Sequence, residues 1–340
     1  MRKVFLGGLV PEFVPTLLGL LIAAPLSLLY AQGSAGGVRF IEHGQPPVVI
    51  HATVGDAISA REAHGHGGGG GGSTNLYYHG GTSDGSAGTV GVETAPKIYL
   101  VLWGSQWNNN DPSGEAAILE SFYSGVGGSS WLNSVTQYCQ GVPSGTVFCT
   151  TGTLAGNQMY MRAGVLADNG SAAPSHPTQS QLAAEAVRVA GLLGNTSAAS
   201  NASVQYVIAT AHGNSSSGFG TQYCAWHSAT SSSYGNIAYT NLPYITDAGA
   251  SCGANFNGLG PNAGITIVGG HEMGETITDQ FPSSGWLDSN GAENGDKCAW
   301  ITSGQGASAN VTFPDHSTFP VQSLWSNAFN NGAGGCVLSY

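Results

Sequence analysis

Segment 265–296 combines an apolar pattern with ionisable side chains that are rare elsewhere in the chain. Only 8% of the 340 residues are charged, against about 25% in an ordinary soluble domain. Six carboxylates nevertheless fall in this segment: Glu272, Glu275, Asp279, Asp288, Glu293 and Asp296. Its first half repeats apolar residues at helical spacing, which predicts a buried helix starting near Pro261. Because an unpaired buried carboxylate is costly, a bound cation is the simplest explanation of the cluster.

A His-Glu-x-x-Glu sequence lies within this expected helix. His271 and Glu275 are four residues apart, so both side chains leave one helix face. The spacing is that of two metal ligands in His-Glu-x-x-His peptidases, and Glu272 holds the position of their general base. Glu293 and Asp296 resemble the downstream Glu-x-x-Asp element of gluzincin-type zinc peptidases. We therefore predict His271, Glu275 and Glu293 as metal ligands, with Asp296 supporting His271.

The sequence is compatible with more than one metal and with more than one choice of accessory residues. One histidine and two carboxylates form an oxygen-rich donor set, which suits Zn²⁺ and is also compatible with Ca²⁺ or Mn²⁺. An exposed helix followed by an acidic loop is the alternative to a metal site. His212, after an apolar run, and His227, beside Cys224, are candidates for stabilising a transition-state oxyanion. A structural histidine bonded to backbone explains each of them equally well.

The N-terminus and the cysteines predict export. Basic residues at 2–3, an apolar stretch at 17–29 and small residues at 33–35 are typical of a cleaved signal peptide, residues 1–35. A retained membrane anchor is the alternative, but the apolar stretch is short for a span. Six cysteines predict three disulfides in an oxidising compartment. Many pairings are possible, and spacing favours Cys139–Cys149, then Cys224–Cys252 and Cys298–Cys336. We expect a secreted protein with no membrane association after cleavage.

Residues 36–95 are predicted to be a Gly/His-rich linker or a propeptide-like segment. Six consecutive glycines at 67–72 cannot repay the entropy of ordering the backbone. His51 belongs to the same histidine-rich stretch, which indicates a solvated spacer or a weak metal-binding tail. A loosely attached strand at the apolar residues 47–50 is a further alternative.

Residues 96–340 are predicted to form a single globular domain. Buried strands are expected at 97–103 and 204–211, and helices at 113–125, 131–138 and 178–193. Ser113 is the expected N-cap of the first helix. Since strands alternate with helices, the predicted class is α/β or α+β, with a central mixed sheet, a metal-site helix and stabilising disulfides.

The low and negative charge of the chain limits the classes of partner that it can bind. The formal net charge of −11 and the absence of a basic patch argue against nucleic acid and anionic membranes. Aromatic and amide side chains suit glycan contacts. We therefore expect an extracellular polypeptide, or cell-wall and glycan material, as the partner.

The order of these motifs resembles the phosphate-induced protein / EXORDIUM family, and more closely its secreted bacterial and fungal relatives. The likeness spans about residues 96–336 and rests on the strand at 98–104, Cys224-x-x-His227, His271-Glu272-x-x-Glu275, Glu293-x-x-Asp296-x-Cys298 and Cys336. It implies an extracellular protein, with plant members acting in the cell wall and in growth, and it implies no particular reaction. The histidine and glycine run at 64–72 departs from the plant pattern.

Two functions are consistent with these features. The first is a secreted metal-dependent hydrolase, foremost a zinc metallopeptidase, in which Glu272 takes a proton from water and His212 or His227 stabilises the oxyanion. The second is a non-catalytic extracellular wall- or glycan-associated protein with a structural metal. The surroundings of Glu272, an open coordination position or a packed wall, discriminate between them. A serine hydrolase is disfavoured because no G-x-S-x-G motif occurs.

Overall fold

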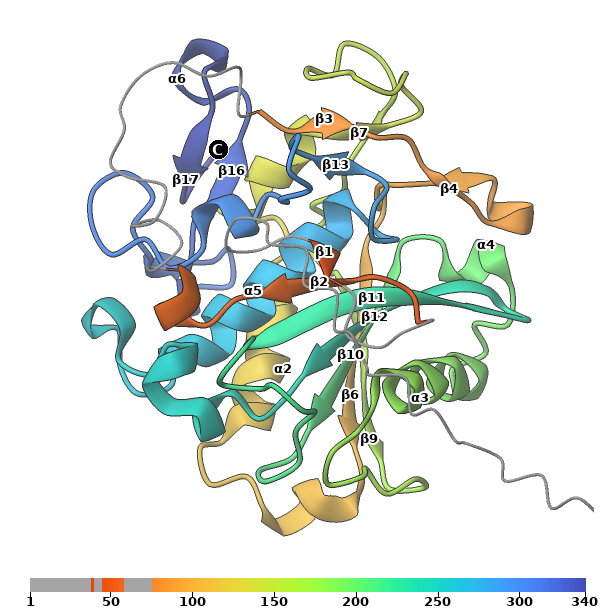
Figure 1. The fold of residues 1–340 in the computed structure, drawn as a ribbon, viewed down its shortest axis with the longest axis vertical. Coiled ribbons are helices and arrows are strands. Elements are labelled where there is room, and N and C mark those ends of the chain that lie inside the picture. Colours follow the sequence, from red (N-terminus) through yellow and green to blue (C-terminus); the bar gives the residue numbers. More distant parts are fainter. Residues whose placement is uncertain (1–37, 40–44, 58–74) are drawn as a thin grey trace, which may run out of the picture.

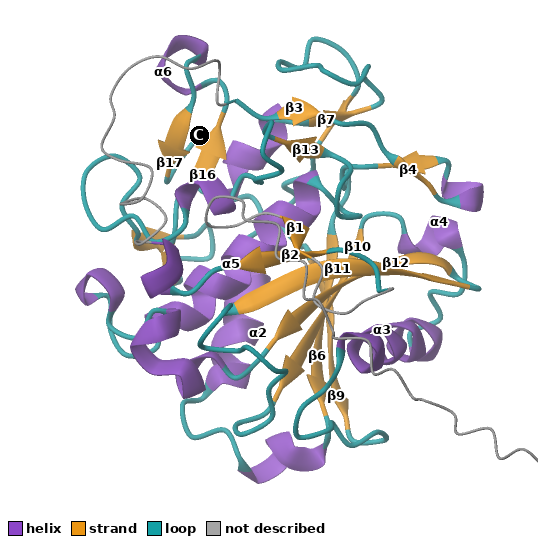
Figure 2. Cartoon of the chain, in the orientation of Figure 1, coloured by secondary structure: helices purple, strands orange, loops and turns teal. Residues whose placement is uncertain are grey.

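The computed structural model describes residues 38–39, 45–57 and 75–340. The predicted signal peptide and the glycine run lie outside the described residues. The predicted α/β class is confirmed, with helices on both faces of a central mixed sheet (Figures 1 and 2).

The central sheet has the order β1-β2-β11-β12-β10-β6-β9. In this order the strands are Val38–Arg39, Val48–His51, Ala225–Ser232, Gly235–Leu242, Val204–Thr210, Lys97–Trp103 and Arg162–Asp168. The last four run parallel, whereas β11 pairs antiparallel with both β12 and β2. The strand expected at 97–103 is therefore confirmed, and the one expected at 204–211 ends one residue earlier.

One face of the sheet is covered by α3 (Gln179–Leu192), as the sequence predicts. Thr178 caps it by accepting from the Gln181 amide, and the Gln181 side chain accepts from the Thr178 amide in return. Apolar residues of α3 pack against alternate residues of β6 and β10: Leu182, Ala186 and Val189 against Val101, Tyr206 and Ile208. Residues of β2 join this cluster, so the strand is part of the core.

The other face is covered by α2 (Glu115–Gly125) and α5 (Ala263–Thr278), which contribute to the largest apolar cluster (Figure 1). The predicted Ser113 cap is wrong, because Gly114 holds the N-cap position. The Asp111 carboxylate accepts from the Glu115 and Ala116 amides at 2.7 and 3.2 Å. A charged acceptor placed before the helix thus replaces the shorter hydroxyl. Residues 132–137 form a 3₁₀ turn, η3, where a short helix was expected.

All 16 residues of α5 are buried, which explains its glycines. A Cβ at Gly270 would lie 3.0 Å from the Phe122 ring and 3.1 Å from the Trp131 ring. A Cβ at Gly274 would lie 3.2 Å from Leu324. Small residues here let α2 and the C-terminal segment pack directly on the helix, which removes its ionisable side chains from water.

Smaller elements complete the fold. Two-stranded pairs join β3 (Tyr77–Tyr78) to β13 (Trp286–Leu287), β4 (Thr82–Ser83) to β5 (Thr89–Val90), β7 (Cys139–Gln140) to β8 (Thr153–Leu154), β14 (Ala309–Thr312) to β15 (Thr318–Val321) and β16 (Leu324–Ser326) to β17 (Gly335–Val337). The short helices are α4 (Ala198–Asn201) and α6 (Phe329–Gly332). The 3₁₀ turns are η1 (Gly85–Ala87), η2 (Ser105–Asn109), η3 (Leu132–Gln137), η4 (Ile245–Cys252), η5 (Phe256–Gly258) and η6 (Asp296–Cys298).

The disulfide pairing favoured by spacing is confirmed: Cys139–Cys149, Cys224–Cys252 and Cys298–Cys336. The second bond ties the start of β11 to η4, and the third ties η6 to β17. Three disulfides indicate an oxidising compartment. Among the described residues, no helix has the length and apolar character needed to cross a membrane.

Part of the segment 36–95 is built into the domain. Strand β2 pairs with β11, and its four residues are all buried. Farther along, β3 pairs with β13, and the Glu93 amide donates to the Ile277 carbonyl at 2.8 Å. Strand β2 and residues such as Leu76, Tyr78 and Val92 therefore belong to the packed core, so these parts of the segment are not a solvated spacer.

Candidate metal centre

Three parts of the fold bring the predicted ionisable residues together in the interior. Helix α5 supplies His271, Glu272 and Glu275, and β11 supplies His227. The loop before η6 and its first residue supply Glu293 and Asp296. Each of these six side chains belongs to a residue that is at most 4% exposed. The sequence separates them by up to 69 positions (296 − 227), and the fold joins them in one cluster, which we call the metal centre.

The tautomer of His271 follows from its neighbour Gln322. The Gln322 side-chain Nε2 donates to the Gly295 carbonyl at 2.8 Å, so its Oε1 is left as an acceptor. This Oε1 lies 3.2 Å from His271 Nδ1, which must therefore carry the hydrogen. Burial lowers the pKa of His271, which favours the neutral ring. His271 Nε2 then presents a lone pair.

This lone pair faces two carboxylates. His271 Nε2 lies 3.0 Å from Glu275 Oε1 and 3.8 Å from Asp296 Oδ1. One ligand atom from each of the three residues fits within 4.8 Å of the others. An imidazole lone pair and two carboxylate oxygens repel one another unless a cation or a proton lies between them. The three residues therefore have donor atoms that could hold a metal ion.

The loop carrying Asp296 is held against α5 by hydrogen bonds. The Asp296 amide donates to Glu275 Oε1 at 2.8 Å, and the Glu293 amide donates to Asp296 Oδ2 at 3.2 Å. Asn294 Nδ2 donates to the Gly274 carbonyl at 2.9 Å. A Cβ at Gly295 would lie only 2.8 Å from His271 Nδ1, so glycine is needed for this close approach. These contacts position Asp296, rather than Glu293, beside the His271–Glu275 pair.

His227 links the remaining two carboxylates. Its Nδ1 lies 3.0 Å from Glu272 Oε2, while its Nε2 lies 3.6 Å from Glu293 Oε1, which is too long for a hydrogen bond. Burial by itself lowers the pKa of His227, but the carboxylates of Glu293 and Glu272 outweigh it and raise that pKa well above its ordinary value. The contact between His227 Nδ1 and Glu272 Oε2 holds the Glu272 carboxylate in place.

The centre contains more buried acceptors than the described residues satisfy. The atoms without a hydrogen-bond partner there include His271 Nε2, Glu272 Oε1, Glu275 Oε2, both Glu293 carboxylate oxygens and Asp296 Oδ1. Burial raises the pKa of Glu275 to about 7, and it raises the pKa values of Glu293 and Asp296 well above their usual range. A divalent cation would offset this penalty and return the carboxylates to their charged forms. The residues therefore fit a metal ion.

His51 also belongs to the centre, although the sequence indicated a solvated spacer or tail. Its ring stacks on His271 with centroids 3.8 Å apart and planes parallel, and it stacks on Trp300 on another side at 4.9 Å. Because imidazole lone pairs lie in the ring plane, parallel rings cannot direct them to one ion. His51 thus covers His271 in this arrangement, although one ligand atom from each of His51, His271 and Glu272 also lies within 4.8 Å of the others. The sequence signal for the burial of His51 is its position directly after the apolar residues 47–50.

The fold does not bring His212 to the metal centre. His212 follows β10, its side chain is 48% exposed, and its Nδ1 lies 2.5 Å from Asp247 Oδ1. The Gly213 amide donates to Asp247 Oδ2 at 2.8 Å. His212 therefore belongs to a surface pair, and the metal centre gives no support to its predicted part in stabilising an oxyanion.

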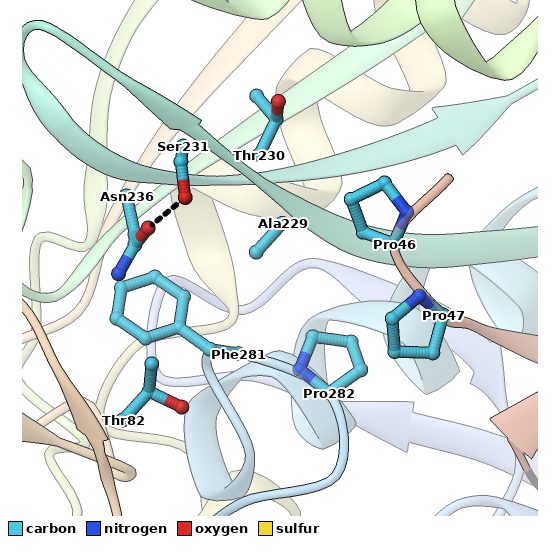
Figure 3. A pocket seen from close by; sticks show the side chains of 9 residues that line it. All are labelled: Pro46, Pro47, Thr82, Ala229, Thr230, Ser231, Asn236, Phe281 and Pro282. Atoms are coloured by element: carbon cyan, nitrogen blue, oxygen red, sulfur yellow. Dashed lines mark hydrogen bonds between the residues drawn. The ribbon is translucent and has the colours of Figure 1, made fainter. Parts of the chain in front are cut away.

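The surface hollow in Figure 3 has a volume of about 160 Å³ and does not include the metal centre. Its walls come from the residues before β2, from β11 and β12, from β4 and from the segment after α5 (Figure 3): Pro46, Pro47, Thr82, Ala229, Thr230, Ser231, Asn236, Phe281 and Pro282. The residues of the metal centre are buried, whereas this hollow follows the neighbouring stretch of β11.

No protein-family model matches the chain, and no curated protein or solved structure is significantly similar to it. The resemblance to the phosphate-induced protein family stays a prediction.

Proposed function

We propose that the protein is an extracellular metal-dependent hydrolase that acts on polypeptides, with zinc held by His271, Glu275 and Asp296. The observation that carries the proposal is the Nε2 of His271, which carries no hydrogen in the tautomer set by Gln322 and faces two buried carboxyl groups, with Glu275 Oε1 at 3.0 Å and Asp296 Oδ1 at 3.8 Å. One nitrogen and two carboxylate ligands suit zinc, and manganese or calcium would accept the same oxygens. Glu293 then flanks His227, in place of its predicted role as a ligand.

Glu272 is the residue best suited to move a proton. It follows His271 on α5, and His227 holds its Oε2, whereas its Oε1 has no hydrogen-bond partner among the described residues. A bound zinc ion supplies Lewis-acid polarisation of a carbonyl and makes water more acidic. In this proposal Glu272 Oε1 would accept the proton of the attacking water, and His227, whose Nδ1 lies 3.0 Å from Glu272 Oε2, would keep the carboxylate oriented.

The burial of the centre favours a second candidate function. His227, His271, Glu272 and Glu275 are 0% exposed, which suits a closed structural metal site better than an open catalytic one. A non-catalytic wall- or glycan-associated protein would use such a metal only for stability. This candidate requires that the centre stay closed to substrate under all conditions.

A cleavage assay separates the two candidates. The native chain, purified from the medium of secreting cells, is incubated with an unstructured polypeptide before and after treatment with a metal chelator. We expect cleavage that the chelator abolishes and that added zinc restores. Cleavage that survives removal of the metal would contradict the proposed mechanism. A chain that binds zinc and never cleaves would favour the structural candidate.

A further inference from the structure

One of the two faces of strand β2 lies over the metal centre. In the antiparallel pair, Val49 lies opposite His227, and His51 lies opposite Ala225. Paired residues share a face of the sheet, and residues along a strand alternate between faces. Val49 and His51 therefore point to the side of α5. Val48 and Ile50 point to the opposite side, where they join the apolar cluster of α3.

The contacts of β2 close the centre from this side. The His51 ring lies directly on His271, and Val49 and His51 are both 0% exposed. The strand is held by its backbone, because the Cys224 amide donates to the His51 carbonyl at 2.7 Å and the Trp300 indole donates to the Ala52 carbonyl at 2.8 Å. These backbone bonds do not depend on the side chains of β2. Another extended chain would make the same type of bond.

The edge of β11 is longer than the strand that covers it. Strand β2 pairs with residues 225–228 of β11, whereas β11 extends to Ser232. In the described chain, the stretch after Ser228 has no strand on this edge and lines the hollow in Figure 3 with Ala229, Thr230 and Ser231. An extended polypeptide that pairs along β11 would have room in this hollow on one side and would pass the metal centre on the other.

We propose that β2 occupies the binding position of an extended polypeptide substrate, so that the chain holds its own metal centre closed. The proposal rests on the proposed hydrolase function for the fate of the bound polypeptide. Substrate recognition is then by strand addition to the edge of β11, with affinity from main-chain hydrogen bonds and selectivity from alternate side chains. Activity requires that β2 leave β11, which exposes Glu272, His227 and His271 together.

A matched pair of substitutions tests this arrangement in the full chain. Val48→Ala removes packing that docks β2, while Val204→Ala makes the same change on β10, which β11 and β12 separate from β2 in the sheet. Both valines are buried in the same apolar cluster. Three rates are compared with the native chain: hydrogen exchange of the β11 amides, transfer of bound zinc to a chromogenic chelator, and cleavage of an unstructured polypeptide.

Val48→Ala is expected to raise all three rates by on the order of tenfold, and Val204→Ala is expected to leave them near native values. Equal rates in the two variants would overturn the proposal, because loss of general stability would then explain any increase. Hydrogen exchange needs no metal, so it decides the role of β2 even in a chain that binds none. Faster exchange and zinc transfer with no cleavage would contradict the hydrolase function and leave the closure by β2 standing.

Discussion

Replacing Glu272 with Gln is expected to lower polypeptide cleavage by about two to four orders of magnitude while metal content stays unchanged. The amide is almost the same size as the carboxylate, and its oxygen still accepts from His227, 3.0 Å away in the native chain. It cannot take a proton from water. Cleavage rates and bound zinc are measured on the same preparations.

Glu120→Gln is the matched control for this substitution. Glu120 lies on α2 with a side chain that is 52% exposed, and its ion pair with Arg162 is at the surface. Native cleavage is expected in this variant. Cleavage that persists in Glu272→Gln would contradict the role of Glu272 as the base. Loss of zinc from Glu272→Gln would identify Glu272 as a ligand, because its carboxylate also lies within reach of His227 and Glu275.

Removing the metal is expected to lower the thermal midpoint of unfolding by about 10 °C. A ligand present at about a thousand times its Kd stabilises the native state by about 4 kcal/mol, which corresponds to a shift of this size in a domain of a few hundred residues. The physical reason is the set of buried carboxylates in the metal centre, which repel one another and several of whose oxygens have no hydrogen-bond donor in the described chain. Calorimetry before and after chelation measures the shift.

Two histidine substitutions test this prediction, one at the metal centre and one at the surface as its matched control. His271→Ala removes a ligand, so its midpoint is expected to be lower and to no longer respond to zinc. His176→Ala removes an exposed ring that contacts the Ser215 carbonyl, and its response to zinc is expected to match that of the native chain. A zinc response that survives in His271→Ala would place the stabilising metal elsewhere.

Local patterns in the sequence were sufficient to predict much of the scaffold. The apolar run 97–103 is a continuous local signal for a strand. For α3, both the helical periodicity and the capping residues lie within a few positions of one another in the sequence. The buried helix α5 was expected from apolar spacing, and its His271 and Glu275 converge because helix geometry alone fixes positions i and i+4. The disulfides follow spacing because each joins the nearest remaining cysteine.

Features that depend on tertiary contacts were not predictable in this way. His51 reaches the metal centre only because β2 pairs with β11, and no local pattern reports that pairing. Asp296 lies beside His271 and Glu275, where Glu293 was expected, because the Gln322 and Asn294 side-chain amides donate to the Gly295 and Gly274 carbonyls and hold the loop against α5. His212 was expected to end a strand, but β10 ends at Thr210, and the chain beyond it leads His212 to the surface and to Asp247.

The metal content of the secreted, mature protein tests the proposed metal centre most directly. Plasma mass spectrometry on protein purified without chelators is expected to find a single zinc ion per chain, and His271→Ala is expected to reduce it strongly. A calcium ion would favour the structural candidate over the hydrolase. A chain that holds no metal after gentle purification, and takes up none from added zinc, manganese or calcium, would contradict the central claim.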